Sequence, residues 1–389
     1  MGRKFLIIDD SALMRRVISD IIKTNSEYEV LDVAVDGVEG FDKLVSHPNY
    51  YDMVILDINM PKMNGLELLE MLQKHRMHEA VVVVSTVAKE GTVETIRALE
   101  LGALDFVTKP ENFYEVKGEG FRTNLLNMIK VVTGDGFNKE RLTAAPSVGT
   151  RTGVQLKNVI TKDKPQTSTK PGTNDLIPAM HNRDAVLRSA SGVKRGKGKV
   201  VALACSTGGP KSLQHVIPLL PKNLDAGVVL VQHMPKGFTV SLAQRLDTLS
   251  EVSVKEAEDG DVIQKGHVYI APGGKHLLVE RTATGHVIKL SDAPAVDGLR
   301  PCANNMYNSL VNSGYDEITC VVLTGMGADG TKGIKALKEN GRKIYVIGQD
   351  AASCVVYGMP RSIAEAGLVN EVRTLDEIAE SIVKNVGVI

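Results

Sequence analysis

The sequence is poor in cysteine, in net charge and in long apolar runs. Its four cysteines, Cys205, Cys302, Cys320 and Cys354, all lie in the second half of the chain, and no two have the C-x-x-C spacing. This scarcity and spacing disfavour both a zinc site and a disulfide framework. The formal net charge is zero, so no overall field attracts nucleic acid or an anionic membrane.

No apolar run approaches the length that a membrane-spanning helix requires, so we expect no membrane insertion. The early run 5–8 is followed at once by Asp9 and Asp10, which argues against a signal peptide. With 43% hydrophobic and 24% charged residues, the composition is that of a soluble globular protein, which we expect in the cytoplasm. The 389 residues suffice for two ordinary domains and a connector.

Residues 1–130 alternate short apolar or β-branched runs with segments of helical periodicity. The runs cover residues 5–8, 29–35, 53–56, 81–84 and 104–108. This alternation predicts an α/β domain with a five-stranded parallel sheet.

Polar residues follow the ends of these predicted strands: Asp9 and Asp10, Asp57, Ser85 and Lys109. Because the carboxyl ends of parallel strands meet at one edge of a sheet, we expect these side chains to converge. Three carboxylates suit a hard cation such as Mg²⁺. Asp57 would accept a phosphoryl group whose oxygens Lys109 and the Ser85 hydroxyl hold. Acids that merely solvate the sheet edge are the alternative, which the complete set disfavours.

The strings D-D-S, L-D-I-N-M-P-K-M-N-G, V-S-T and T-K-P, in this order, resemble the receiver domain of bacterial response regulators. The resemblance implies a flavodoxin-like fold and phosphorylation of Asp57 by a histidine kinase. The implied Mg²⁺ ligands are Asp9, Asp10, Asp57 and the backbone of Asn59. Phe106 matches the aromatic switch position of that family, with a ring packed on the sheet as the alternative interpretation.

Residues 131–198 have the composition of a flexible basic linker. Periodicity is lost from about Gly134, and Thr, Pro, Gly, Asn and Lys dominate. Residues 139–199 hold thirteen Lys or Arg against four acidic residues but no aromatic residue on which a base could stack. A solvated linker is therefore favoured over a nucleic-acid tether, and a short helix over 176–190 is a further hypothesis.

Residues 199–389 predict a second, doubly wound α/β domain. The apolar run 200–205 breaks into S-T-G-G-P, which places Ser206 at the end of a strand, and the runs 228–231 and 318–323 place His233 and Asp329 at two more. Gathered at one edge, these residues form the set that nucleophilic acyl transfer requires: a hydroxyl, a base and an orienting carboxylate. The alternatives are that Ser206 or Thr207 only caps the next helix, and that histidines such as His276 are structural.

A dinucleotide-binding or non-catalytic output domain is the rival hypothesis. G-M-G-A-D-G follows a strand and precedes the predicted helix 331–340, and Asp350 ends a further strand at the distance of a ribose contact. Against this hypothesis, the Asp329 carboxylate would repel a pyrophosphate. The hypothesis also leaves Ser206 and His233 without a role.

The strings C-S-T-G-G-P, V-Q-H-M-P, I-A-P-G-G-K-H, L-T-G-M-G-A-D-G and V-V-Y-G-M-P resemble the chemotaxis protein-glutamate methylesterases of the CheB family. The resemblance implies Ser206 as nucleophile, His233 as base and Asp329 as its orienting partner, with Thr207 and the Met326 N–H at the oxyanion or substrate site. It also implies methanol release from glutamate methyl esters, and deamidation of glutamines, on methyl-accepting chemotaxis receptors. The esterase would need no cofactor, and a chemotaxis histidine kinase would donate the phosphoryl group that activates it.

The chain departs from that family at Ala204 and Cys205, where Gly and Ala are usual, at Cys302, Ala303 and Asn304, where Ser-Val-Asp is usual, and at Ala351, where an acid is common. Cys205 is a conceivable rival nucleophile. Strand alternation directs its side chain away from that of Ser206, and a buried thiol is commonly inert.

Overall fold

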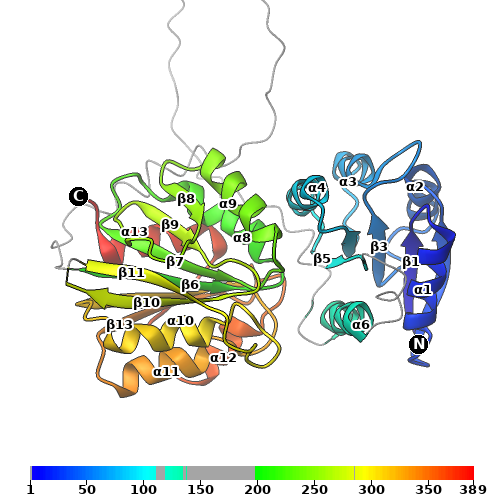
Figure 1. Ribbon diagram of the computed structural model, residues 1–389. Helices are drawn as coiled ribbons and strands as arrows, with labels where there is room; N and C mark the ends of the chain where they lie inside the picture. The colour runs from blue at the N-terminus through cyan, green and yellow to red at the C-terminus, as the bar shows by residue number, and fades with distance from the viewer. Residues whose placement is uncertain (1, 111–118, 135–136, 138–197, 284) are drawn as a thin grey trace, which may run out of the picture.

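The computed structural model describes residues 2–110, 119–134, 137, 198–283 and 285–389. Two α/β domains lie side by side, the N-terminal one in blue and teal and the C-terminal one in green to red (Figure 1). The hypothetical helix 176–190 and nearly all of the predicted linker lie outside the described residues. No helix in the described ranges is both long and apolar enough to cross a membrane.

The N-terminal domain has a five-stranded sheet of order β2-β1-β3-β4-β5 in which all neighbouring strands are parallel, as predicted. Its strands are β1 (Arg3–Ile8), β2 (Tyr28–Ala34), β3 (Met53–Asp57), β4 (Val81–Ser85) and β5 (Asp105–Thr108). Every residue of β3 and β4 is buried, because helices cover both faces of the sheet.

The helices of this domain are α1 (Ala12–Ile22), α2 (Gly37–Ser46), α3 (Gly65–Lys74), α4 (Lys89–Glu100) and α6 (Glu119–Thr133). Side chains fix where some of them begin. The Ser11 hydroxyl accepts a hydrogen bond from Met14 N at the start of α1, and Asn64 and Glu67 form a capping box at the start of α3. Each start lies just after a strand end, so the helix caps and the acidic edge are close together.

The C-terminal domain has a seven-stranded sheet of order β14-β13-β12-β6-β7-β9-β8, again with parallel neighbours. The strands are β6 (Lys199–Cys205), β7 (Ala226–Gln232), β8 (Ser253–Glu256), β9 (His267–Ile270), β12 (Glu317–Val322), β13 (Ile344–Gln349) and β14 (Glu371–Arg373). An antiparallel pair, β10 (His276–Thr282) and β11 (Gly285–Ser291), lies outside this sheet.

Helices cover both faces of the larger sheet, which confirms the doubly wound prediction. On one face lie α8 (Gly209–Val216), α9 (Phe238–Leu249) and α13 (Ile378–Val386), and on the other lie α10 (Ala303–Ser309), α11 (Thr331–Glu339) and α12 (Met359–Glu365) (Figure 1). Short 3₁₀ turns occupy Ile217–Leu219, Leu310–Asn312 and Leu375–Glu377. The central strands β6, β7 and β12 are almost wholly buried, so their carboxyl ends have fixed positions.

The start of α8 corrects one expectation from the sequence. Its N-cap is Gly208, in the left-handed conformation with φ +77°, and no side chain caps the helix. A Cβ at Gly208 would lie 2.7 Å from the Val355 side chain, so glycine is required there for space as well as for conformation. Capping by Ser206 or Thr207 is therefore wrong, and the Ser206 hydroxyl is available for chemistry.

Candidate active site and phosphorylation site

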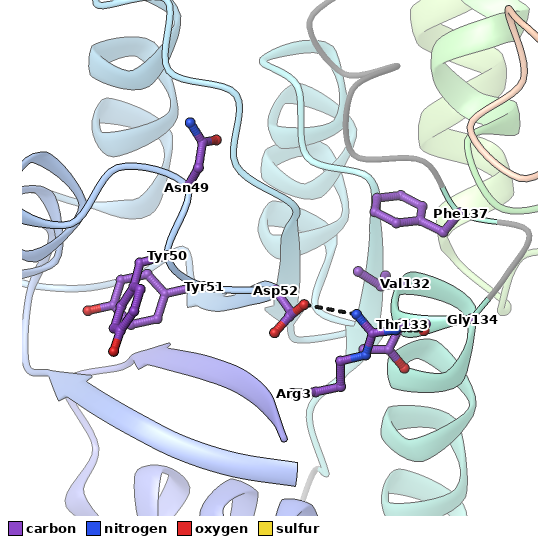
Figure 2. Close-up of a pocket in the computed structure, with 9 residues that line it drawn as sticks. All are labelled: Arg3, Asn49, Tyr50, Tyr51, Asp52, Val132, Thr133, Gly134 and Phe137. Carbon is purple, nitrogen blue, oxygen red and sulfur yellow. Dashed lines mark hydrogen bonds and ion pairs between the residues drawn. The ribbon is translucent and has the colours of Figure 1, made fainter. Parts of the chain in front are cut away.

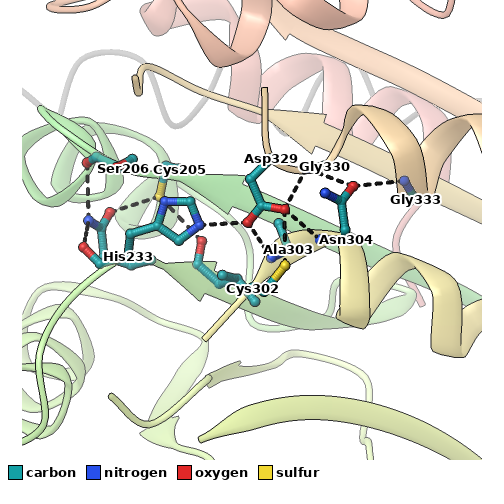
Figure 3. A network of polar contacts seen from close by, with 11 residues as sticks. Cys205, Ser206, His233, Cys302, Ala303, Asn304, Asp329, Gly330 and Gly333 are labelled. Atoms are coloured by element: carbon teal, nitrogen blue, oxygen red, sulfur yellow. Dashed lines mark hydrogen bonds and ion pairs between the residues drawn. The ribbon is translucent and has the colours of Figure 1, made fainter. Parts of the chain in front are cut away.

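Ser206 and His233 each follow directly after one of two neighbouring parallel strands. In β6 and β7, Cys205 is in register with Gln232, and His233 N donates a hydrogen bond to Cys205 O at 3.1 Å. Ser206 N donates to Thr324 O, just past β12, at 3.0 Å. Three strand ends therefore meet at one edge of the sheet, as the sequence predicts (Figure 3).

His233 and Asp329 are in direct contact. His233 Nε2 lies 2.8 Å from Asp329 Oδ2, and the two side chains are only 8% and 5% exposed. The main-chain N–H groups of Ala303 and Asn304 also donate to this carboxylate, at 2.6 and 2.9 Å, and the Cys302 thiol lies 3.2 Å from Oδ1. The carboxylate therefore binds one ring nitrogen, Nε2, and leaves Nδ1 free of Asp329 (Figure 3).

Burial alone would raise the pKa of Asp329. The hydrogen bond and charge of His233, with the N–H groups of Ala303 and Asn304, instead lower this pKa to about 2. Asp329 is therefore ionised at neutral pH. An ionised, fixed carboxylate holds the imidazole in one orientation and stabilises the imidazolium that forms when His233 takes a proton.

Ser206 is partly exposed, and its hydroxyl makes no hydrogen bond within the described residues. The structure thus brings Ser206 and His233 to adjacent strand ends and joins His233 to Asp329, but it does not form the hydroxyl-to-imidazole contact. Such contacts are often long without substrate and tighten in the Michaelis complex.

Two main-chain N–H groups near Ser206 are available as donors. Neither Thr207 N nor Met326 N has an acceptor in the described part of the chain. The Gly325 backbone packs against the nucleophile, since a Cβ at Gly325 would lie 2.8 Å from Ser206 Cβ. The loop that carries Met326 is therefore close enough to serve an oxyanion that forms at Ser206.

Three carboxylates gather at the edge of the smaller sheet. Oxygen atoms of Asp9, Asp10 and Asp57 lie within 4.8 Å of one another. Lys109 Nζ is 2.7 Å from Asp57 Oδ2 and 3.1 Å from Asp9 Oδ2, and the latter atom is buried without a well-directed hydrogen bond. Three carboxylates whose oxygens lie this close together, two of them largely buried, form an all-oxygen set that fits a hard divalent cation such as Mg²⁺.

Burial raises the pKa of Asp57 above its usual value, and Lys109 opposes this effect by charge and hydrogen bonding. Asn59 N lies 3.4 Å from Asp57 Oδ1, so the main chain of Asn59 lies beside the Asp57 carboxylate. Ser85 is not directed toward Asp57: its hydroxyl donates to Gly91 O at 3.2 Å and accepts from Thr95 Oγ1 at 2.6 Å.

The two domains contact each other beside the active edge. α4 packs on α9, with Thr92 Oγ1 2.8 Å from Ser241 Oγ and an ion pair between Glu100 and Arg245. The Phe106 ring packs on the other domain rather than only on its own sheet. A further contact joins Asp105 to the hydroxyl of Thr207, the neighbour of Ser206.

Two side chains to which the sequence analysis gave no role complete the site. Gln232 donates to the main-chain oxygens of both Ser206 and His233, and Asn304 Oδ1 accepts from Gly330 N and Gly333 N at 3.1 and 2.8 Å. The sequence signal of Gln232 was its place in the string V-Q-H-M-P, and Asn304 was noted only as a departure from the family pattern. Asn304 and Asp329 accept from the N–H groups of Gly330 and Gly333 at the start of α11, where a pyrophosphate would bind, so the structure contradicts the dinucleotide hypothesis.

Two dismissals made from the sequence agree with the structure. Cys205 is fully buried, which raises the pKa of its thiol far above the usual range, so it is no rival nucleophile. His276 is also fully buried, and its Nε2 lies 3.1 Å from Pro294 O, as a structural histidine would.

A cavity of about 170 Å³ lies beside the amino end of β1, at the opposite end of the smaller sheet from Asp57 (Figure 2). It is lined by Arg3, Asn49, Tyr50, Tyr51, Asp52, Val132, Thr133, Gly134 and Phe137. Arg3 already pairs with Asp52 at 3.1 Å and with Thr133 O at 2.9 Å. The guanidinium of Arg3 is therefore already paired within the protein, and we assign no ligand to this cavity.

Fold and site together define a class of protein: a phosphoacceptor receiver joined to an α/β hydrolase with serine, histidine and aspartate at three strand ends. Comparison of sequences agrees. Residues 201–382 match the family described as CheB methylesterase, and residues 5–118 match the response regulator receiver domain. The chain belongs to the CheB methylesterase family.

Two full-length relatives are both named protein-glutamate methylesterase/protein-glutamine glutaminase. The one from Desulfotalea psychrophila is 37% identical over 98% of this chain and 98% of its own length. The one from Symbiobacterium thermophilum is 39% identical over 99% and 97%. The crystal structure of the Thermotoga maritima CheB methylesterase catalytic domain is 43% identical, with a TM-score of 0.47, over 49% of this chain and 99% of that one.

Proposed function

We propose that this enzyme removes methyl groups from glutamate methyl esters of methyl-accepting chemotaxis receptors and deamidates receptor glutamines, with Ser206 as nucleophile. One observation carries the assignment of residues. The imidazole of His233, one strand from Ser206, is held at 2.8 Å by the buried carboxylate of Asp329. The names of the full-length relatives support the choice of substrate.

In the first step, Ser206 Oγ attacks the side-chain carbonyl carbon and His233 takes the hydroxyl proton. The N–H groups of Thr207 and Met326 donate to the oxyanion of the tetrahedral intermediate. His233 then returns the proton to the leaving group, which departs as methanol from an ester or as ammonia from an amide. Water, deprotonated by His233, attacks the acyl-enzyme and releases glutamate.

We further propose that Asp57 accepts a phosphoryl group from a chemotaxis histidine kinase and that this event activates the esterase. Bound Mg²⁺ would supply positive charge at the transferred group, held by Asp9, Asp10, Asp57 and the Asn59 backbone. Lys109, already 2.7 Å from Asp57, would hold a phosphoryl oxygen. Because the kinase requires ATP, we expect the enzyme to act in the cytoplasm.

Contacts beside Ser206 support a closed, low-activity arrangement before phosphorylation. The receiver packs α4 on α9 and engages Thr207 through Asp105, so a receptor segment must displace it to reach Ser206. Phosphorylation would shift the population toward an open arrangement without contributing a catalytic group.

The deciding experiment measures methanol release from methylated receptor membranes with and without a phosphodonor. Ser206→Ala should abolish release in both conditions and retain the wild-type circular dichroism. Ser250→Ala is a matched control, because that hydroxyl is buried at the end of α9 and makes no hydrogen bond in the described residues. Wild-type release from Ser206→Ala would remove Ser206 from the nucleophile role.

A further inference from the structure

Gln232 occupies a special place between the two residues that exchange a proton. It is the last residue of β7, it precedes His233, and it is in register with Cys205, which precedes Ser206. Gln232 is only 2% exposed. Its side chain therefore lies inside the protein, beside the carboxyl ends of β6 and β7.

The amide of Gln232 binds the main chain of both catalytic residues. Gln232 Nε2 donates to Ser206 O at 3.0 Å and to His233 O at 3.0 Å, which uses both of its N–H groups. The last main-chain bond between the two strand ends runs from His233 N to Cys205 O. The side-chain amide thus links the two segments one residue beyond the last main-chain hydrogen bond between β6 and β7.

The surroundings fix which way the amide faces. Gln232 Oε1 accepts from the Cys205 thiol at 3.0 Å, on the side opposite the two carbonyl oxygens. A flipped amide would set Oε1 against those two carbonyls and Nε2 against the thiol. The close approach also requires a glycine, since a Cβ at Gly209 would lie 2.0 Å from Oε1.

We propose that Gln232 is a positioning residue that fixes the separation of Ser206 and His233, and that the Cys205 thiol fixes the orientation of its amide. This inference rests on the proposed roles of Ser206 and His233. It explains why a cysteine is accommodated directly before the nucleophile although its thiol takes no part in the chemistry. A misplacement of about 1 Å between reacting groups costs roughly 100-fold in rate, so a link at this point controls kcat.

The test uses the full-length chain with a small-molecule phosphodonor and Mg²⁺. Gln232→Leu keeps the side-chain volume and deletes all three hydrogen bonds. We expect kcat for methanol release to fall roughly 10- to 100-fold while KM changes less than about threefold. The rate at which a fluorophosphonate modifies Ser206 should fall by the same factor. A modification rate per folded molecule within threefold of wild type would overturn the role of Gln232.

The fluorophosphonate measurement separates this inference from the choice of substrate. If wild-type enzyme reacts with the reagent but releases no methanol, the receptor ester proposal fails and the comparison of Gln232→Leu with wild type still stands. If wild-type Ser206 does not react at all, both fail.

A second pair of variants tests the role of the Cys205 thiol. This pair also tests the proposal if Gln232→Leu does not fold. Cys205→Ala should slow fluorophosphonate modification about three- to tenfold, and Cys205→Ser, which restores a donor, should return it to within about twofold. Cys320→Ala is the matched control. Cys320 is equally buried in the adjacent β12, but no hydrogen bond joins it to Gln232 in the described residues.

A double-mutant cycle completes the test. If Cys205 acts through Gln232, Cys205→Ala should cause no further loss in the Gln232→Leu background. Additive losses would show that the thiol acts independently and would overturn its assignment. Equal slowing by Cys205→Ala and Cys205→Ser would do the same, because only one of these variants removes the donor.

Discussion

Phe106 of the receiver lies against Phe238 of the esterase, with ring centroids 4.3 Å apart and ring planes inclined by 32°. Phe106 is in β5, directly after Asp105, and Phe238 is the first residue of α9, five positions beyond His233. Both rings are buried, at 8% and 0% exposure. Phe106 is thus in physical contact with the first residue of the helix that follows His233.

Phe106→Ala should therefore raise esterase activity in the absence of phosphodonor. Aromatic pairs contribute about 0.5–1.5 kcal/mol beyond the area they bury, and the truncated ring also loses that area. A loss of about 1–3 kcal/mol from the closed arrangement raises the open population roughly 5- to 150-fold when the closed state predominates. Methanol release without phosphodonor measures this change, and the activation ratio should fall accordingly.

Phe41→Ala provides the comparison for that experiment. Phe41 is in α2 and packs on the receiver core beside His75, away from the esterase. This variant should lower receiver stability without raising basal activity. Basal activity that stays at the wild-type level in a folded Phe106→Ala protein would show that the aromatic contact does not hold the domains closed.

Asp105 should make the closed arrangement sensitive to pH. Burial raises the pKa of Asp105 to about 6, although hydrogen bonds from Phe106 N and the Thr207 hydroxyl oppose the rise. An acid whose pKa is raised favours the closed arrangement when it is protonated. The contact is therefore most favourable below the ordinary aspartate pKa of about 4 and weakens as pH rises through about 6.

The ratio of basal to phosphodonor-activated methanol release measures this effect, because any pH dependence of the chemical step itself is common to both rates and cancels in the ratio. We expect the ratio to rise between about pH 4 and pH 6 in the wild type and to level off above about pH 7. Asp105→Asn, which cannot ionise, should flatten the rise and lower basal activity at pH 7.5. An equally steep rise in Asp105→Asn would assign the pH dependence to another group.

Strand ends were the part of this molecule that the sequence predicted best. A buried parallel strand is a continuous apolar run, so the residue that ends each run is visible, and Ser206, His233 and Asp57 were placed in this way. The position of Asp329 was harder to predict from the sequence, because this residue lies in a loop beyond β12. Its role required the pairing of β6 with β12, which brings that loop back toward His233.

Contacts that are made through single side chains could not be predicted from the sequence. Gln232 and Asn304 act through hydrogen bonds to main-chain groups, which carry no residue-type signal in the partner. The idea that a hydroxyl of Ser206 or Thr207 caps α8 was wrong, because Gly208 is the N-cap of that helix and no side chain caps it. Phe238 had no feature distinguishing it from a core aromatic, since its partner belongs to another domain.

Asn304→Ala should impair catalysis through Asp329. Asn304 Oδ1 accepts from the buried N–H groups of Gly330 and Gly333, and its own N–H donates to Asp329. Truncation leaves the buried Gly333 N–H without its acceptor, at about 1–3 kcal/mol, and leaves Gly330 N bonded to Asp329 Oδ1 alone, which loosens the loop that carries Asp329. We expect kcat to fall about tenfold with a lower unfolding temperature, measured by methanol release and thermal unfolding.

Asn304→Asp is the matched variant, because it keeps an oxygen acceptor at the same position. The resemblance to the family supports this choice, since aspartate is usual there. We expect it to retain kcat within about threefold of wild type. A tenfold loss in Asn304→Asp would show that the amide nitrogen, not the acceptor oxygen, is required.

Asp57→Asn should abolish activation by a phosphodonor and leave basal methanol release unchanged. The amide cannot form the bond to phosphorus that the carboxylate oxygen forms, while the esterase residues lie in the other domain. Chelation of divalent cations with EDTA should have the same effect, since the three carboxylates within 4.8 Å of one another need a cation before they accept more negative charge. Asp20→Asn, an exposed position in α1 whose nearest cation is Arg16 at 3.9 Å, should preserve activation in full. Activation that survives in Asp57→Asn would move the phosphoacceptor to a different side chain, and activation that survives EDTA would remove the cation from the reaction.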